Sequence, residues 1–106
     1  MNPEQLRDTA RAAYDRQLAK QNLKILMASR LTVAHRDGVF NINTDLFVLL
    51  GLTDDEEMVI LDAYDVPVLI NRTELITLAK QRYQEIMNEW LLEYTTQSQV
   101  RNAQQL

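Results

Sequence analysis

Apolar residues in the second half of the chain recur at the spacing of one helix face. Asn71 and Glu74 precede them in an N-x-x-E pattern, which is typical of a helix capping box. The pattern predicts a long amphipathic helix over residues 72–95. No proline or glycine interrupts residues 72–106, so the helix could run past Tyr94, but residues 96–106 are polar and we expect a tail that is frayed or ordered by a partner. The stripe comprises Ile76, Ala79, Tyr83, Ile86 and Trp90.

The first 29 residues predict a second long helix with a thinner apolar stripe. Asn2 is a good N-cap, and Pro3 suits the first helical turn. We therefore expect a helix that starts at Pro3 and ends near Ser29. Its first half buries little within one small domain, so it should be mobile or packed on another chain. The stripe begins with Leu6, Ala10, Ala13 and Gln17 and thickens at Leu23, Leu26 and Met27.

Between the two helices, short β-prone runs alternate with turn residues. Residues 31–42 predict a β-hairpin, because Asp37 is followed by glycine between two apolar runs. Residues 44–51 predict a short helix that stops at its glycine. Residues 58–70 predict a second hairpin. Together these elements predict a single α+β domain over residues 1–106.

The second hairpin carries two aspartates at its corner, Asp62 and Asp65. A carboxylate pair can perform glycosidic or metal chemistry when it is held in a cleft. Aspartate also favours turns, because its side chain accepts hydrogen bonds from nearby backbone N–H groups. We expect the second role here. Pro67 has no N–H to donate, which places its strand at a sheet edge or turns the N–H side of that residue outward.

Composition narrows the classes of function. The chain has 106 residues, no cysteine and a net charge of −4. An acidic balance argues against nucleic acid as the main partner, since that binding relies on Lys and Arg at the phosphates. No apolar run is long enough for a membrane span and the start has no signal-peptide pattern. We expect a soluble protein without a membrane partner or a small-molecule substrate, and the lack of cysteine is compatible with synthesis in the cytoplasm.

Charge is unevenly distributed along the chain. Residues 1–36 carry seven basic and three acidic side chains, a net +4, whereas residues 37–106 carry four basic and twelve acidic ones, a net −8. Such asymmetry is typical of two faces that meet each other or meet oppositely charged neighbours, although a solvated surface with accidental clustering gives the same count.

No catalytic, cofactor or metal motif is recognisable. His35 is the single histidine, and no serine or threonine stands near it in a nucleophile pattern. The acidic run 54–57 lacks the alternate spacing and central glycine of a calcium loop. We therefore expect no catalytic residue, no cofactor and no metal site, and a protein that is not an enzyme.

Two surface features predict a partner interface instead. Three glutamates on the long helix stand four residues apart, and like charges at that spacing destabilise a helix unless something basic offsets them. Arg82 can reach the first of these glutamates on the same helix. Two arginines near the start of the chain also stand four residues apart, and they are natural partners within the chain or from a neighbour. Trp and Tyr are enriched among interface anchors. The candidate interface residues are Trp90, Leu91, Tyr94, Glu85, Glu89, Glu93, Arg7 and Arg11.

The order of these pieces resembles a small domain of unknown function that recurs in tailed-bacteriophage tail and tail-fibre assembly proteins. The matching segments are "RLTVAHRDGVFNINTD" at 30–45 and "VILDAYDVPVLINRTELITLAKQRYQEIMNEWLLEY" at 59–94. The basic N-terminal helix lies outside the resemblance. The resemblance implies a virion structural or assembly component, in the tail, tail fibre, baseplate or neck, that contacts other phage structural proteins and self-associates. It also implies that the protein is made in the cytoplasm of the host.

Two other classes of function stay open at this point. An acidic phage-encoded inhibitor of a host protein would use the glutamates of the long helix as a mimic of nucleic acid. A small enzyme would depend on Asp62 and Asp65.

Overall fold

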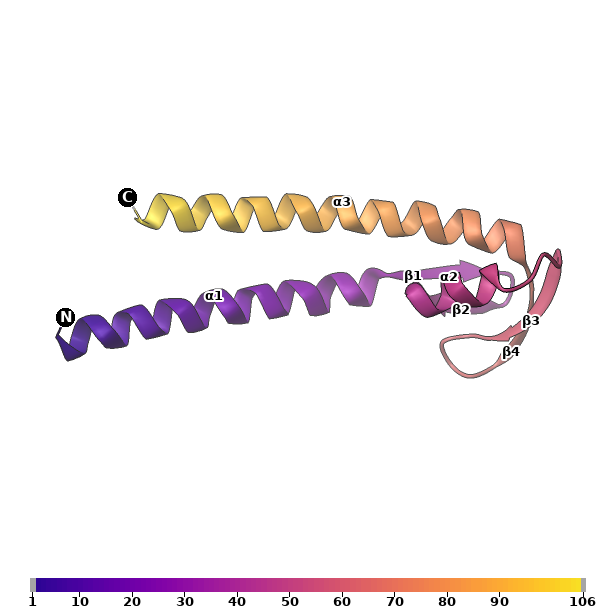
Figure 1. The fold of residues 1–106 in the computed structure, drawn as a ribbon, viewed down its shortest axis with the longest axis horizontal. Coiled ribbons are helices and arrows are strands. Elements are labelled where there is room, and N and C mark those ends of the chain that lie inside the picture. Colours follow the sequence, from indigo (N-terminus) through magenta and orange to yellow (C-terminus); the bar gives the residue numbers. More distant parts are fainter. Residues whose placement is uncertain (1, 106) are drawn as a thin grey trace.

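The computed structural model describes residues 2–105 and confirms the α+β fold. Two long helices lie side by side and antiparallel, with both chain ends at one end of the molecule and the β-hairpins and the short helix at the other (Figure 1). The molecule measures 65 × 23 × 22 Å. Its elements are α1 (Pro3–Arg30), β1 (Thr32–His35), β2 (Gly38–Asn41), α2 (Thr44–Gly51), β3 (Glu57–Leu61), β4 (Pro67–Asn71) and α3 (Arg72–Gln105).

α3 is longer than the sequence pattern predicts. It continues to Gln105, so the polar stretch from residue 96 is not a separate tail within the described residues. No proline or glycine interrupts it, and the backbone bonds of a helix do not need an apolar stripe to form. Residue 106 lies outside the described residues.

Asparagine side chains start all three helices. Asn2 forms the complete capping box with Gln5, and the Asn43 side chain accepts from the N–H of Leu46 at 2.9 Å. Asn71 accepts from the N–H of Glu74 at 3.0 Å. Its own N–H donates to His35, not to Glu74, so the expected capping box at α3 is only half formed.

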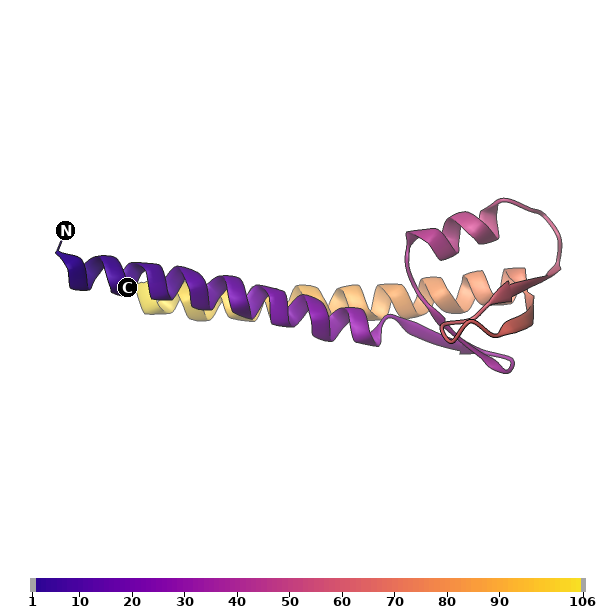
Figure 2. The ribbon, with the colours of Figure 1, turned by 90° about the horizontal axis from the view of Figure 1, so that it is seen from below.

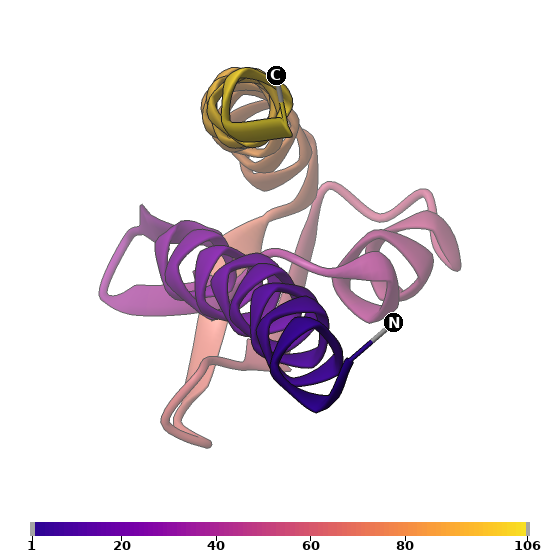
Figure 3. The ribbon, with the colours of Figure 1, turned by 90° about the vertical axis from the view of Figure 1, so that its left-hand side faces the viewer.

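The four strands form two separate antiparallel hairpins, not one sheet. Val33 pairs with Phe40 in the first, and Val59 with Leu69 in the second. Seen along the long axis, α2 and the β1–β2 hairpin lie on opposite sides (Figure 3), and the view turned by 90° separates them in the same way (Figure 2).

The main core joins both hairpins, α2 and the start of α3. Phe40 is its largest buried side chain. Gly38 lies beside it: a Cβ at this glycine would come within 2.9 Å of the Phe40 ring and 3.0 Å of Val68 Cγ2. The core residues are Phe40, Ile42, Leu46, Leu50, Ile60, Val68, Ile70, Leu75 and Ala79.

A second, smaller cluster holds the two long helices together. Leu23 and Met27 of α1 pack with Ile86 of α3, and the half-buried Trp90 covers them. Beyond this cluster both helices continue toward the chain ends. We call this part, α1 over residues 3–22 and α3 over residues 91–105, the stalk.

Candidate functional site

The Asp62–Asp65 corner is a turn built by backbone hydrogen bonds. Asp62 Oδ1 accepts from the N–H of Tyr64 at 2.8 Å and of Val66 at 3.0 Å. These bonds hold the pKa of the Asp62 carboxyl below its ordinary value of 3.8, and the bond from the Val66 N–H has the largest effect. Asp65 adopts the left-handed conformation with φ 61°, which aspartate tolerates better than most residues. Its backbone N–H donates to Asp62 O at 3.1 Å.

Two residues at the first hairpin corner close the outer edge of β4. The N–H of Asn71 donates to Nε2 of His35 at 3.1 Å. Arg36 donates from Nη1 to the carbonyl of Leu69 at 3.2 Å and from Nη2 to Glu57 Oε1 at 3.2 Å. His35 is buried and has a structural role. This role was not evident from the residues that surround His35 in the sequence. Only the docking of one hairpin on the other creates it.

The outer face of the second hairpin is apolar, a feature that we did not predict from the sequence. Its inward residues belong to the core, yet its outward residues are also large and hydrophobic. Val59 is 62% exposed and Leu61 60% exposed. The unbroken apolar runs on both strands were the available signal, because a half-buried strand alternates apolar with polar residues. The other exposed hydrophobics here are Tyr64, Val66 and Leu69.

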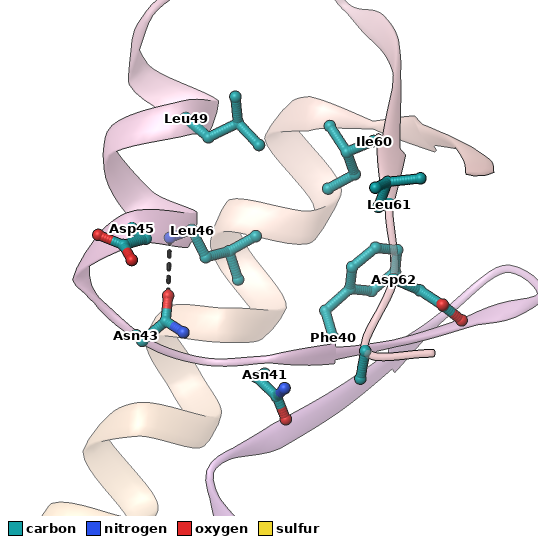
Figure 4. A pocket seen from close by; sticks show the side chains of 10 residues that line it. Phe40, Asn41, Asn43, Asp45, Leu46, Leu49, Ile60, Leu61 and Asp62 are labelled. Atoms are coloured by element: carbon teal, nitrogen blue, oxygen red, sulfur yellow. Dashed lines mark hydrogen bonds between the residues drawn. The ribbon is translucent and has the colours of Figure 1, made fainter. Parts of the chain in front are cut away.

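A groove of about 210 Å³ lies between α2, β2 and β3 (Figure 4). Phe40, Leu46 and Ile60 give it an apolar floor, and Asp45 and Asp62 line it beside them. Within residues 2–105, no three His, Cys, Asp or Glu side chains gather to hold a metal ion. The helices of the same part of the chain contain no apolar stretch long enough to cross a bilayer.

The three predicted anchors on α3 have different environments. Trp90 packs against the cluster of Leu23, Met27 and Ile86 that joins the two helices, so it belongs to the contact between the helices more than to a free surface. Leu91 is 65% exposed and Tyr94 47% exposed. These two remain candidates for an interface.

The predicted pair of Arg82 with Glu85 is present, whereas the glutamates of α3 do not pair with Arg7 or Arg11 of the same chain. Glu89 pairs with Arg30 at 2.9 Å, and Glu85 pairs with Arg82 at 3.3 Å. Arg11 stands nineteen residues before Arg30, about 28 Å along the axis at ~1.5 Å per residue. Arg7 lies a further turn away. Neither arginine reaches the glutamates of its own α3. No ion pair of Glu93 is recorded among the described residues.

α1 presents an apolar stripe on the side away from α3. Tyr14, Leu18 and Ile25 stand at spacings of four and seven, and are 66%, 40% and 68% exposed. Ile25 lies two residues from the buried Leu23, about 200° around the helix at ~100° per residue. Arg7 extends the stripe toward the chain start at the same spacing. We call Arg7, Arg11, Tyr14, Leu18 and Ile25 the outer stripe.

Comparison of the chain with protein-family models, with curated proteins and with solved structures finds no match. The candidate surfaces therefore rest on geometry alone.

Proposed function

We propose that the chain is a non-enzymatic structural or assembly protein that works through contacts of its stalk with other helices. The observation that carries this is the outer stripe. Every residue from 2 to 22 is exposed, yet α1 is helical from Pro3. A helix without tertiary packing is only marginally stable in water. A partner that covers the outer stripe would supply the missing packing.

The spacing of the outer stripe fits a coiled-coil partner. Its members recur at three- and four-residue intervals, with a gap only between Leu18 and Ile25, where Gln21 occupies the intermediate position. This is the period at which two helices pack side chains into each other's gaps. Arg7 and Arg11 at one end require acidic residues on the partner helix, which sets its direction and register.

The partner class follows from the resemblance to tailed-phage tail and tail-fibre assembly proteins. We propose that the partners are other phage structural proteins, with self-association through the same stalk, and that the protein is part of the virion. Leu91 and Tyr94 on α3 provide a second exposed apolar stripe for such contacts. If the proposal holds, purified particles of the phage that encodes this chain contain it in a fixed copy number, which mass spectrometry measures. Particles that lack it altogether would leave only an assembly role.

Sedimentation velocity of the full chain tests the role of the outer stripe. We expect species heavier than the 12.3 kDa monomer, alone or with virion components, and a shift to the free chain in Leu18→Lys. Ala12→Lys is the matched control. It adds the same charge to the same helix, about 120° away around the axis from Leu18 at ~100° per residue. A wild-type chain that stays monomeric alone and with virion components contradicts the proposal.

The acidic-inhibitor alternative has less support. Two of its three glutamates, Glu85 and Glu89, are already paired with arginines of the same chain. Partial neutralisation weakens the field that a nucleic-acid mimic needs. Strong, salt-sensitive binding to a basic host protein, lost in a Glu89→Gln variant, would revive it.

A further inference from the structure

The outer edge of β3 carries unpaired backbone groups. Asp62 N donates to Val66 O at 2.9 Å, which identifies this pair as hydrogen-bonded. Hydrogen-bonded and non-hydrogen-bonded pairs alternate along antiparallel strands. Val59 and Leu61 therefore turn their N–H and C=O groups away from β4. In residues 2–105 no backbone group pairs with them on that side.

The same alternation makes β4 the closed edge of the hairpin. It turns the backbone groups of Leu69 and Asn71 outward, where Arg36 binds the carbonyl of Leu69 and His35 the N–H of Asn71. Pro67 has no N–H to offer. Natural sheets protect an exposed edge with proline or with side chains that cover its backbone groups. Within the described part of the chain, Val59 and Leu61 of β3 have no such protection.

The groove described above adjoins this open edge. It is lined by the consecutive residues 60–63 of β3 and its turn, and by Leu46 and Leu49 across from them on α2 (Figure 4). At one end Ala63 N donates to Val39 O at 2.7 Å, which joins the two hairpins and closes that end. A groove of about 210 Å³ between a helix and an unpaired strand offers both main-chain hydrogen bonds and an apolar pocket for a side chain.

Charge selects the occupant. Asp45 and Asp62 line the groove, with their carboxylates on its two outer sides (Figure 4). The acidic run 54–57 leads into β3, whose first residue is Glu57. Basic side chains on an incoming strand would complement them. A second copy of β3 would not complement these acidic groups. Antiparallel pairing about Val59 would bring the acidic run of one copy toward Asp62 of the other, and like charges on paired strands repel each other.

We propose that the open edge of β3 binds an extended, basic and apolar segment of a partner protein as an added strand. One apolar side chain enters the groove over Phe40, and Lys or Arg side chains lie over Asp45 and Asp62. This surface lies on the hairpins at the opposite end of the molecule from the stalk tip (Figure 1), and the proposal does not depend on the function of the stalk.

The proposal can be tested by selecting, from a displayed random library of short linear peptides, those that bind the full chain. We expect enriched sequences in which apolar residues alternate with Lys or Arg. Val59 makes no hydrogen bond to β4, so Val59→Pro removes the outward N–H without removing a bond of the hairpin. The selected peptides should bind this variant about tenfold more weakly or worse. Val59→Thr, which keeps the N–H and the β-branched shape, should bind like the wild type.

Hydrogen exchange of the unmodified chain gives the same test without a substitution. A selected peptide should slow exchange at the N–H groups of Val59 and Leu61. The proposal is overturned if the library yields no enriched peptide, if the peptides bind Val59→Pro and Val59→Thr equally, or if protection falls only on the stalk.

Discussion

The backbone N–H of Asn71 donates to Nε2 of His35 across 3.1 Å, a contact between residues 36 positions apart. It ties the corner of the first hairpin to the junction of β4 and α3. The direction of α3 thus depends on a buried side chain from another element, in addition to the Asn71 cap.

Removing the His35 ring should destabilise the fold. His35→Ala leaves the N–H of Asn71 without its acceptor in a partly buried site, which costs about 1–3 kcal/mol. Urea unfolding followed by circular dichroism measures the change in the free energy of unfolding. Asp37→Ala, two residues on in the exposed turn, is the control and should change stability by less than about 0.5 kcal/mol. Equal effects of the two variants would argue against the role assigned to His35.

The two glycines of the chain provide a matched pair. Gly38→Ala places a methyl group 2.9 Å from the Phe40 ring, and overpacking of this kind costs about 1–3 kcal/mol. Nothing lies within 4 Å of a Cβ at Gly51, in the last position of α2. Gly51→Ala should therefore be neutral or stabilise by up to about 1 kcal/mol. Thermal unfolding of both variants shows whether the midpoints move in opposite directions.

Asp62 should make the stability of the turn depend on pH. Its pKa is lowered in the folded chain, so its stabilising contribution is complete above the unfolded value near 3.8 and is lost as pH falls through the folded value. Asp62→Asn cannot lose a charge. The stability difference between wild type and this variant should shrink as pH is lowered through that window. A constant difference across the acid range would show that the charge does not contribute.

Trp90 and Leu91 should separate packing from association. Trp90→Ala opens the cluster with Leu23 and Met27 and should lower the free energy of unfolding by about 2 kcal/mol, less than a fully buried Trp→Ala. Leu91→Ala should change stability by less than about 0.5 kcal/mol but weaken any association through the stalk. Chemical unfolding and sedimentation on the same samples test both. A large stability loss in Leu91→Ala would place it in the core instead.

The ion pair between Arg30 and Glu89 should contribute little. Both side chains are about half exposed, 46% and 47%, and exposed pairs are worth less than about 1 kcal/mol. Glu89→Gln should lower stability slightly in low salt and not at all at high salt. An effect that persists at high salt would point to a contact other than charge.

Local patterns in the sequence determined the elements of this protein. Asn2, Asn43 and Asn71 start helices because an asparagine oxygen can accept a free N–H of the first turn, and this needs no distant residue. The period of the apolar residues places α3, and the turn at Asp62 follows from the preference of aspartate for turns. Both signals are local and need no distant residue. The end of α3 was predicted too early, because a polar stretch without proline or glycine carries no stop signal.

Only the tertiary structure decided which surfaces are paired and which are free. Trp90 packs on α1, Glu89 binds Arg30 and His35 closes the edge of β4, since each depends on how elements far apart in the chain dock. The open edge of β3 and the outer stripe of α1 follow from the same docking. A sequence shows that a strand or helix is apolar on two faces, but packing determines which face is left uncovered.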